Sequence, residues 1–206
     1  SDVYKRQYRK NAGGGLLRHP DQIHEILGRL REACGATPFT VKTRVGFESE
    51  EEFDQLLRIF KSHAIDLLTI HGRTVKERYQ TPVHDDRVAQ AVRTLNCPVI
   101  ANGNVVNSQT GLSYLKSTGA AGLMIGRGAI RNPWIFEQIR CATSKQEIPQ
   151  VTGRMILEYI AKLYDETAHE ISEFIEDRHV QKMKKYLVYI SHCLLYTSPS
   201  PRDNSG

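Results

Sequence analysis

The stretch PVIANGNVVNSQTGLSYLKSTGAAGLMIGR, residues 98–127, decides the fold, because it holds two short apolar runs that each stop at glycines. The first run stops at Asn102-Gly103-Asn104, and the second stops at Gly126-Arg127. A helix-like segment separates the two runs, and strand, loop, helix and strand in that order is the repeat of a parallel α/β fold. In an eight-stranded α/β barrel, the loops after the last two strands commonly bind a phosphate. We therefore predict a phosphate site made by these two glycine-bearing segments.

The same alternation of strands and helices extends upstream of this stretch. We predict four strands, at about 39–45, 66–70, 98–102 and 122–126. Ser49 and Glu52 form a capping-box pattern ahead of an amphipathic helix, and Pro20 is placed as a first-turn residue of another. The glycine-rich segment 8–17 is predicted to be a loop. Four β/α units are half of an eight-fold barrel, so the predicted fold class is α/β, the C-terminal half of a (β/α)8 TIM barrel over residues 8–145.

Beyond Val151 the pattern becomes entirely helical. Apolar residues recur at helical spacing over 155–164 and again over 180–190, with no strand between them. We predict a small all-helical domain over residues 150–193. Its basic residues Lys182, Lys184 and Lys185 form either a solvated helix face or a surface for a phosphate backbone.

The composition narrows the class of protein. With 40% hydrophobic and 25% charged residues, the chain resembles a soluble globular protein, and no run approaches the roughly 18 apolar residues of a membrane span. The N-terminus lacks the apolar core of a signal peptide, so a cytoplasmic location is expected. The four cysteines are far apart and include no C-x-x-C pair, which argues against a disulfide framework or a zinc site. The net charge of +5 permits a polyanionic partner.

Both ends of the chain differ abruptly in composition from the segments that they adjoin. The two segments are SDVYKRQ at residues 1–7 and LLYTSPSPRDNSG at residues 194–206. Both resemble translated adapter sequence. We expect both segments to be non-native and exclude them from the reasoning on the fold.

Four motifs fall in an order and spacing that resemble the tRNA-dihydrouridine synthase family. These motifs are Val41-Lys42-Thr43-Arg44, His71-Gly72-Arg73-Thr74, Ile100-Ala101-Asn102-Gly103-Asn104 and Met124-Ile125-Gly126-Arg127-Gly128-Ala129, followed by Asn132-Pro133-Trp134. The resemblance covers about residues 8 to 140. It implies an FMN-binding (β/α)8 barrel with a helical tRNA-binding domain, which reduces a uridine in tRNA to dihydrouridine with NADPH as the hydride source.

The resemblance also implies roles for individual residues. Lys42 and His71 are expected at the cofactor, and Lys42 sits at a strand end, where a positive charge can stabilise negative charge on a reduced flavin ring. The phosphate loop is expected at Asn102, Gly103, Asn104, Gly126 and Arg127, although the family often has Asp where this chain has Asn104. Candidates for tRNA contact are Arg73, Lys76, Arg78 and Tyr79, together with Lys182, Lys184 and Lys185.

The family's proton donor, a cysteine in an Asn-x-Gly-Cys-Pro segment, has no counterpart in this sequence. That segment belongs just upstream of the loop that begins at Lys10, where SDVYKRQ stands here. None of Cys34, Cys97, Cys141 and Cys193 lies at a position suited to the role, so we expect the 206-residue chain alone to be inactive. Two other readings stay open: another phosphate-binding barrel enzyme, such as a dihydroorotate-dehydrogenase-like flavoenzyme or a sugar-phosphate isomerase, and a non-catalytic tRNA-binding barrel.

Overall fold

A computed structural model describes residues 11–77, 81–169 and 176–195 of the chain. The predictions for residues 1–7 and for 196–206 lie outside this range. The chain forms two compact units, of which the first comprises residues 1–105 and 110–125 and the second residues 106–109 and 126–206.

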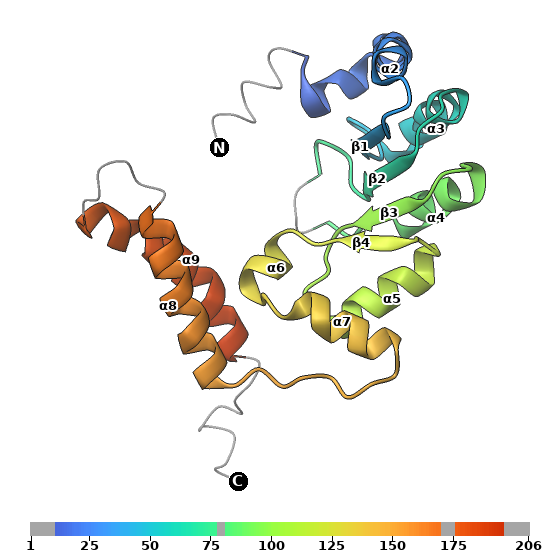
Figure 1. Cartoon of the computed structure of the whole chain (residues 1–206). Helices are drawn as coiled ribbons and strands as arrows, with labels where there is room; N and C mark the ends of the chain where they lie inside the picture. Colours follow the sequence, from blue (N-terminus) through green and yellow to red (C-terminus); the bar gives the residue numbers. More distant parts are fainter. Residues whose placement is uncertain (1–10, 78–80, 170–175, 196–206) are drawn as a thin grey trace. The chain divides into compact units, whose positions relative to one another are not determined.

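The first unit is built on a four-stranded parallel sheet (Figure 1). Its strands are β1 (Thr40–Arg44), β2 (Leu67–His71), β3 (Val99–Asn102) and β4 (Gly122–Met124). They pair side by side in chain order, β1-β2-β3-β4, so the strand order does not reverse along the sheet as it does in a doubly wound fold. This α/β arrangement confirms the four predicted strands and is consistent with an arc of a (β/α)8 barrel. The strands β1 and β4 are shorter than predicted, since β1 starts at Thr40 and ends at Arg44 and β4 ends at Met124.

The helical elements of the first unit precede β1 or connect the strands. They are η1 (Gly13–Arg18), α2 (Pro20–Cys34), η2 (Glu50–Glu52), α3 (Phe53–Ser62), α4 (Asp85–Thr94) and α5 (Ser108–Thr118). The predicted capping box is confirmed, since the Ser49 side chain and Glu52 cap the start of η2 reciprocally. Pro20 opens α2 as predicted. The prediction of a loop over 8–17 was wrong for its last part, because Gly13–Arg18 coil into a 3₁₀ helix in which Gly13 adopts a φ of 56°.

The two faces of the sheet differ in burial. Successive side chains of a strand point to opposite faces, and right-handed crossovers place the connecting helices on one face. The residues on that face form the core, with Leu68, Ile70 and Ala101 each fully buried. The other face carries Lys42 and Met124, both of which are exposed. In the expected (β/α)8 barrel, this second face would be the inward one.

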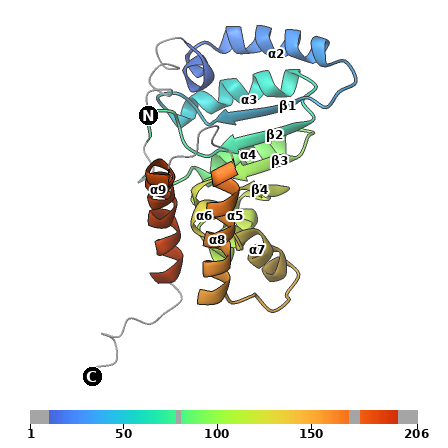
Figure 2. The same cartoon turned by 60° about the vertical axis from the view of Figure 1, so that its left-hand side comes forward.

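The second unit contains four helices among its described residues. They are α6 (Arg127–Arg131), α7 (Ile135–Thr143), α8 (Gly153–His169) and α9 (Glu176–Leu195). The two predicted helical stripes lie within α8 and α9, which run side by side in both views (Figures 1 and 2). Where they meet, His179 is buried and shares a hydrogen bond of 2.9 Å with the hydroxyl of Thr167. The helix predicted to start at Asn132-Pro133 begins at Ile135, because Asn132 accepts a hydrogen bond from the Trp134 amide and closes a turn first.

Candidate functional site

Polar side chains line up across the sheet where its strands end. Arg44, His71 and Asn102 are direct partners in the register of β1 to β3, and the apolar Met124 of β4 ends the row. Lys42 lies two residues before Arg44 and therefore on the same face of the sheet. The carboxyl ends of parallel strands are where α/β barrels carry their active sites. Lys42, His71 and Asn102, predicted from separate motifs, are thus brought to one edge and one face.

Lys42 has an electrostatic environment that disfavours its charged form. Its pKa is lowered from the ordinary value of 10.5, first by partial burial against the sheet and second by the positive charge of Arg44. Arg44 itself donates a hydrogen bond of 2.8 Å to the carbonyl of Thr74, which fixes the guanidinium beside β1. The Lys42 ammonium therefore lies in front of the sheet without a described carboxylate to neutralise it, since no ion pair among the described residues includes it.

The loop after β3 is shaped by close packing. Gly103 adopts a φ of 152°, and a Cβ there would come within 3.1 Å of the methyl groups of Val83. The Tyr114 hydroxyl donates a 3.4 Å hydrogen bond to the carbonyl of Asn102, and burial raises the pKa of this phenol strongly. The side-chain Nδ2 of Asn102 in turn donates to the carbonyl of Met124 at 2.7 Å and ties β3 to β4. Packing against Val83 and this backbone conformation thus account for the glycine, while exposed Asn104 remains open to a ligand.

The loop between β2 and α4 is pinned at its base by Arg73. This guanidinium is 1% exposed and donates from Nε to the carbonyl of Thr81 at 2.8 Å and from a second nitrogen to the same oxygen. The His84 amide donates to the carbonyl of Gly72 at 2.7 Å and closes the loop. In this structure Arg73 therefore holds the loop rather than facing solvent, and contact with an RNA would require the loop to open.

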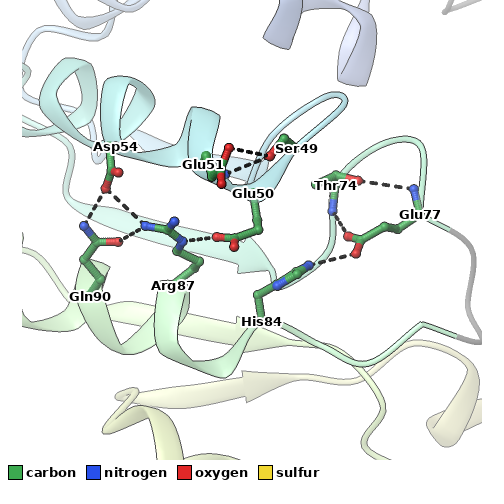
Figure 3. Close-up of polar contacts among 9 residues, drawn as sticks. All are labelled: Ser49, Glu50, Glu51, Asp54, Thr74, Glu77, His84, Arg87 and Gln90. Atoms are coloured by element: carbon green, nitrogen blue, oxygen red, sulfur yellow. Dashed lines mark hydrogen bonds and ion pairs between the residues drawn. The ribbon is translucent and has the colours of Figure 1, made fainter.

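A second set of bonds shapes the middle of the same loop (Figure 3). The Thr74 amide donates to the Glu77 carboxylate at 2.6 Å, and the Glu77 amide donates to the Thr74 hydroxyl at 3.2 Å. The His84 ring nitrogen lies 2.8 Å from the other carboxylate oxygen. Burial alone would raise the pKa of Glu77, but the Thr74 amide and His84 outweigh it and leave the pKa lowered. The loop is thus held around an ionised carboxylate.

A neighbouring cluster joins α4 to the start of α3 (Figure 3). Arg87 donates to the Glu50 carboxylate from Nε and to Asp54 at 3.2 Å, and Gln90 donates to Asp54 at 2.7 Å. The hydrogen bond to Glu50 is the main reason that the pKa of Arg87 is raised. These bonds fix the helix starts that support the loops carrying the predicted site.

The remaining predicted site residues are distributed as follows. Lys76 is exposed on the β2–α4 loop, whereas Arg78 and Tyr79 lie outside the described residues. Gly126 caps α6 and Arg127 is the first residue of that helix, so both belong to the second unit, and the segment predicted as a loop is already helical at Arg127. On α9, Lys184 and Lys185 are exposed and Lys182 is half-buried. The structure describes the two halves of the predicted phosphate site separately.

Sequence reasoning missed the residues that hold the loops. The Thr74-x-x-Glu77 spacing is a capping-box pattern and could have been recognised, although no helix follows it. Val83 and Tyr114 gave no comparable signal, because their role depends on contacts with Gly72 and Gly103 that are distant in sequence.

The structure also locates the cysteines, the potential metal ligands and the helices. The described cysteines, Cys34, Cys97 and Cys141, are half-buried free thiols, and the Cys193 side chain lies outside the described set. Cys97 precedes β3 and therefore lies at the edge of the sheet opposite Asn102. Within the described ranges, no group of three or more potential ligand side chains could hold a metal ion. None of the helices described is both long enough and apolar enough to span a bilayer.

Comparison with known proteins gives a consistent result. The family model for dihydrouridine synthase (Dus) matches residues 4–194, a range that begins inside the segment 1–7 and ends at the first residue of 194–206. A probable tRNA-dihydrouridine synthase of Helicobacter pylori is 36% identical over 177 residues, which cover 85% of this chain and 51% of that protein. The tRNA-dihydrouridine synthase B of Yersinia pestis is 34% identical over 167 residues, covering 78% of this chain and 52% of that protein.

The tRNA-dihydrouridine synthase B of Pasteurella multocida is 31% identical over 166 residues, covering 78% of this chain and 50% of the relative. The chain thus spans about half the length of the curated relatives that it matches. The matched family range includes all four strands and the polar row at their carboxyl ends. The chain belongs to the dihydrouridine synthase family.

Proposed function

We propose that these residues form part of a tRNA-dihydrouridine synthase, which reduces a uridine of tRNA to 5,6-dihydrouridine with FMN as cofactor and NADPH as reductant. The observation that carries the proposal is the placement of Lys42, His71 and Asn102 on one face at the carboxyl edge of the sheet. The printed names of the relatives support the same reaction. The proposed architecture is a (β/α)8 barrel of which β1 to β4 are one half.

The residues at this edge have the chemistry that an FMN site requires. A flavin ring needs a cation near the atoms that become negative on reduction, and Lys42 supplies a cation on the open face. A phosphate needs N–H donors in a loop without obstructing side chains. On the second unit, the space around Gly126 is open, since a Cβ there would meet no atom within 4 Å. When bound, FMN supplies the hydride that is added to C6 of the uracil ring.

We propose that the residues of this chain stabilise negative charge and hold the bound groups in position. Lys42 stabilises negative charge, and its lowered pKa makes it a readier hydrogen-bond donor. His71 is 8% exposed and belongs to a strand of the sheet, so its ring is held in a fixed orientation. Asn102, Gly103 and Asn104 of the first unit are proposed to bind the FMN phosphate. Gly126 and Arg127 of the second unit are proposed for the same role. The proton at C5 is assigned to the family's cysteine, for which this chain has no Asn-x-Gly-Cys-Pro segment.

We assign the tRNA contacts to exposed cations. Lys76 on the β2–α4 loop and Lys184 and Lys185 on α9 are open to solvent. Lysines at such positions bind phosphates of an RNA backbone without reading its sequence. Lys182, which is half-buried, and Arg78, which lies outside the described residues, complete the proposed set. Arg73 acts by holding the loop from which Lys76 projects.

The test joins the amino-terminal half of the H. pylori relative to residues 8–193 of this chain. The chimaera is expressed in cells without dihydrouridine synthases, and dihydrouridine in the tRNA is measured by mass spectrometry. We expect dihydrouridine with the chimaera and at least a tenfold lower rate with Lys42→Ala, because the cation at the flavin is lost. Lys116→Ala, an exposed lysine on α5, is the matched control.

A folded, flavin-containing chimaera that leaves tRNA uridines unreduced would contradict the proposal. The 206-residue chain alone is expected to form no dihydrouridine. Uridine reduction by the purified chain would overturn its expected inactivity and would require an acid other than the family's cysteine.

A further inference from the structure

A cluster outside the predicted site combines two cations with one aromatic ring. The guanidinium carbon of Arg18 lies 3.9 Å from the centre of the Phe47 ring, and Lys76 Nζ lies 5.6 Å from the same centre. Arg18 ends η1, Phe47 follows β1 and Lys76 follows β2, so three separate segments meet here. We call these three residues the Phe47 cluster.

Backbone bonds place this cluster at the carboxyl edge of the sheet. The Lys76 amide donates to the carbonyl of Phe47 at 3.1 Å, and the Val75 amide donates to that of Gly46 at 2.9 Å. On the other side, a Cβ at Gly14 would lie 2.9 Å from a methyl group of Val75, so η1 packs directly against the same loop. The geometry is therefore built by the fold, and the glycines of η1 make its close approach feasible.

The ring fixes one cation in a position to bind a further anion. Phe47 is 1% exposed, while the Arg18 that covers it is exposed. A guanidinium stacked on a ring keeps its N–H groups pointing outward in its own plane, where they match a phosphate bidentately. None of the ion pairs among the described residues includes Arg18.

The carboxylates near the cluster do not neutralise it fully. Glu52 accepts hydrogen bonds from the backbone amides of Phe47, Glu48 and Ser49 and is thereby occupied. Glu48 pairs with Lys76 at 3.3 Å, and both side chains are more than half exposed, so solvent weakens this pair. A phosphate can displace Glu48 from Lys76 and bridge the two cations.

We propose that Arg18 and Lys76, set by Phe47, bind one backbone phosphate of an RNA. This inference rests on the proposed tRNA reaction and adds Arg18 and Phe47 to its binding surface. The phosphate of a flavin is the less suitable occupant, because the predicted phosphate loops follow β3 and β4. The β1 and β4 strands are separated by three strand spacings, roughly 14 Å at about 4.8 Å each.

In the experiment, a tRNA transcript is titrated with the 206-residue chain, and binding is followed by fluorescence anisotropy at salt concentrations from about 50 to about 300 mM. Over this range, the slope of log K against log salt reports the number of phosphate contacts. We expect Arg18→Gln to reduce the slope of log K against log salt by about one, the value for one lost phosphate contact. Arg29→Gln, an exposed arginine of α2 paired with Glu25, is the matched control and leaves the slope unchanged. Circular dichroism checks that each variant is folded.

A second variant gives an effect of opposite sign. Glu48→Gln frees Lys76 from its pair and is expected to tighten RNA binding, which a merely structural cluster would not do. An unchanged slope in Arg18→Gln, or no tRNA binding by the wild-type chain, overturns the assignment. Loss of flavin binding with an unchanged RNA slope also overturns it, in favour of a flavin phosphate. Dihydrouridine formed by the chimaera is measured separately, so the proposed reaction stands or falls on its own result.

Discussion

The two edges of the sheet in the first unit use charge differently. At the amino edge, Arg31 donates to the Asp66 carboxylate at 2.9 Å and to the carbonyl of Thr37 at 2.9 Å, and Asp66 accepts the Phe39 amide at 2.6 Å. At the carboxyl edge, glycines and buried side chains lock the loops, while Lys42 and Lys76 remain exposed above them. At the amino edge, Arg31 and Asp66 are both engaged by the fold. At the carboxyl edge, Arg44, Arg73 and Glu77 are engaged in the same way, but Lys42 and Lys76 stay accessible to a ligand.

The largest effect is expected from disturbing the locked backbone of the carboxyl edge. A Cβ at Gly46 would lie 2.1 Å from the carbonyl oxygen of Ser49, a backbone atom that cannot move independently. We expect Gly46→Ala to lower the free energy of unfolding by about 3 kcal/mol, measured by urea denaturation. Gly28→Ala in α2 is the control, since its Cβ would make ordinary contact with His63 at 3.6 Å and alanine favours the helix by about 1 kcal/mol. Equal stability of the two variants would show that the β1–η2 loop is not tightly packed.

A smaller effect is expected from the amino edge, and on stability alone. Arg31→Met removes the donor that holds Asp66 and the carbonyl of Thr37. The free energy of unfolding should therefore fall, but by less than in Gly46→Ala, because the Asp66 side chain is half exposed to solvent. The hydrogen bond from Phe39 and the charge of Arg31 lower the pKa of Asp66, so its contribution is present above its ordinary pKa of 3.8 and is lost as the pH falls through the folded value. The affinity for tRNA should not change. A loss of tRNA affinity in folded Arg31→Met would break the contrast between the two edges.

The β2–α4 loop should respond to acid in a way that identifies Glu77. Because the folded pKa of Glu77 lies below 4.5, the bonds to Thr74 and His84 persist above that pH and weaken as the pH falls through the folded value. We expect the Thr74 amide proton to shift in NMR spectra over this acidic range in the wild type but not in Glu77→Gln. The substitution should lower stability by only about 1 kcal/mol. A Thr74 titration that survives in Glu77→Gln would exclude Glu77 as the anchor.

The smallest effect concerns the pKa of Lys42. Arg44→Gln removes the neighbouring positive charge, so the pKa of Lys42 should rise toward 10.5, with the contribution of burial left in place. The change is measured by NMR titration of the lysine Cε resonances in the two proteins. Lys61, exposed at the end of α3, serves as an internal control. An unchanged Lys42 pKa would show that burial alone sets its value.

The sequence by itself determined the strands, the capping box at Ser49 and the family, because these depend on local patterns of apolar residues, turns and motifs. Which of its charged residues face solvent was decided only by the tertiary structure. Arg73 and Lys76 are three residues apart and both basic, yet one is buried on the carbonyl of Thr81 and the other is exposed beside Phe47. That difference comes from contacts with segments distant in the chain. Apolar periodicity predicts which hydrophobic faces are buried, but the hydrogen bonds of a single charged side chain across the fold leave no such pattern in the sequence.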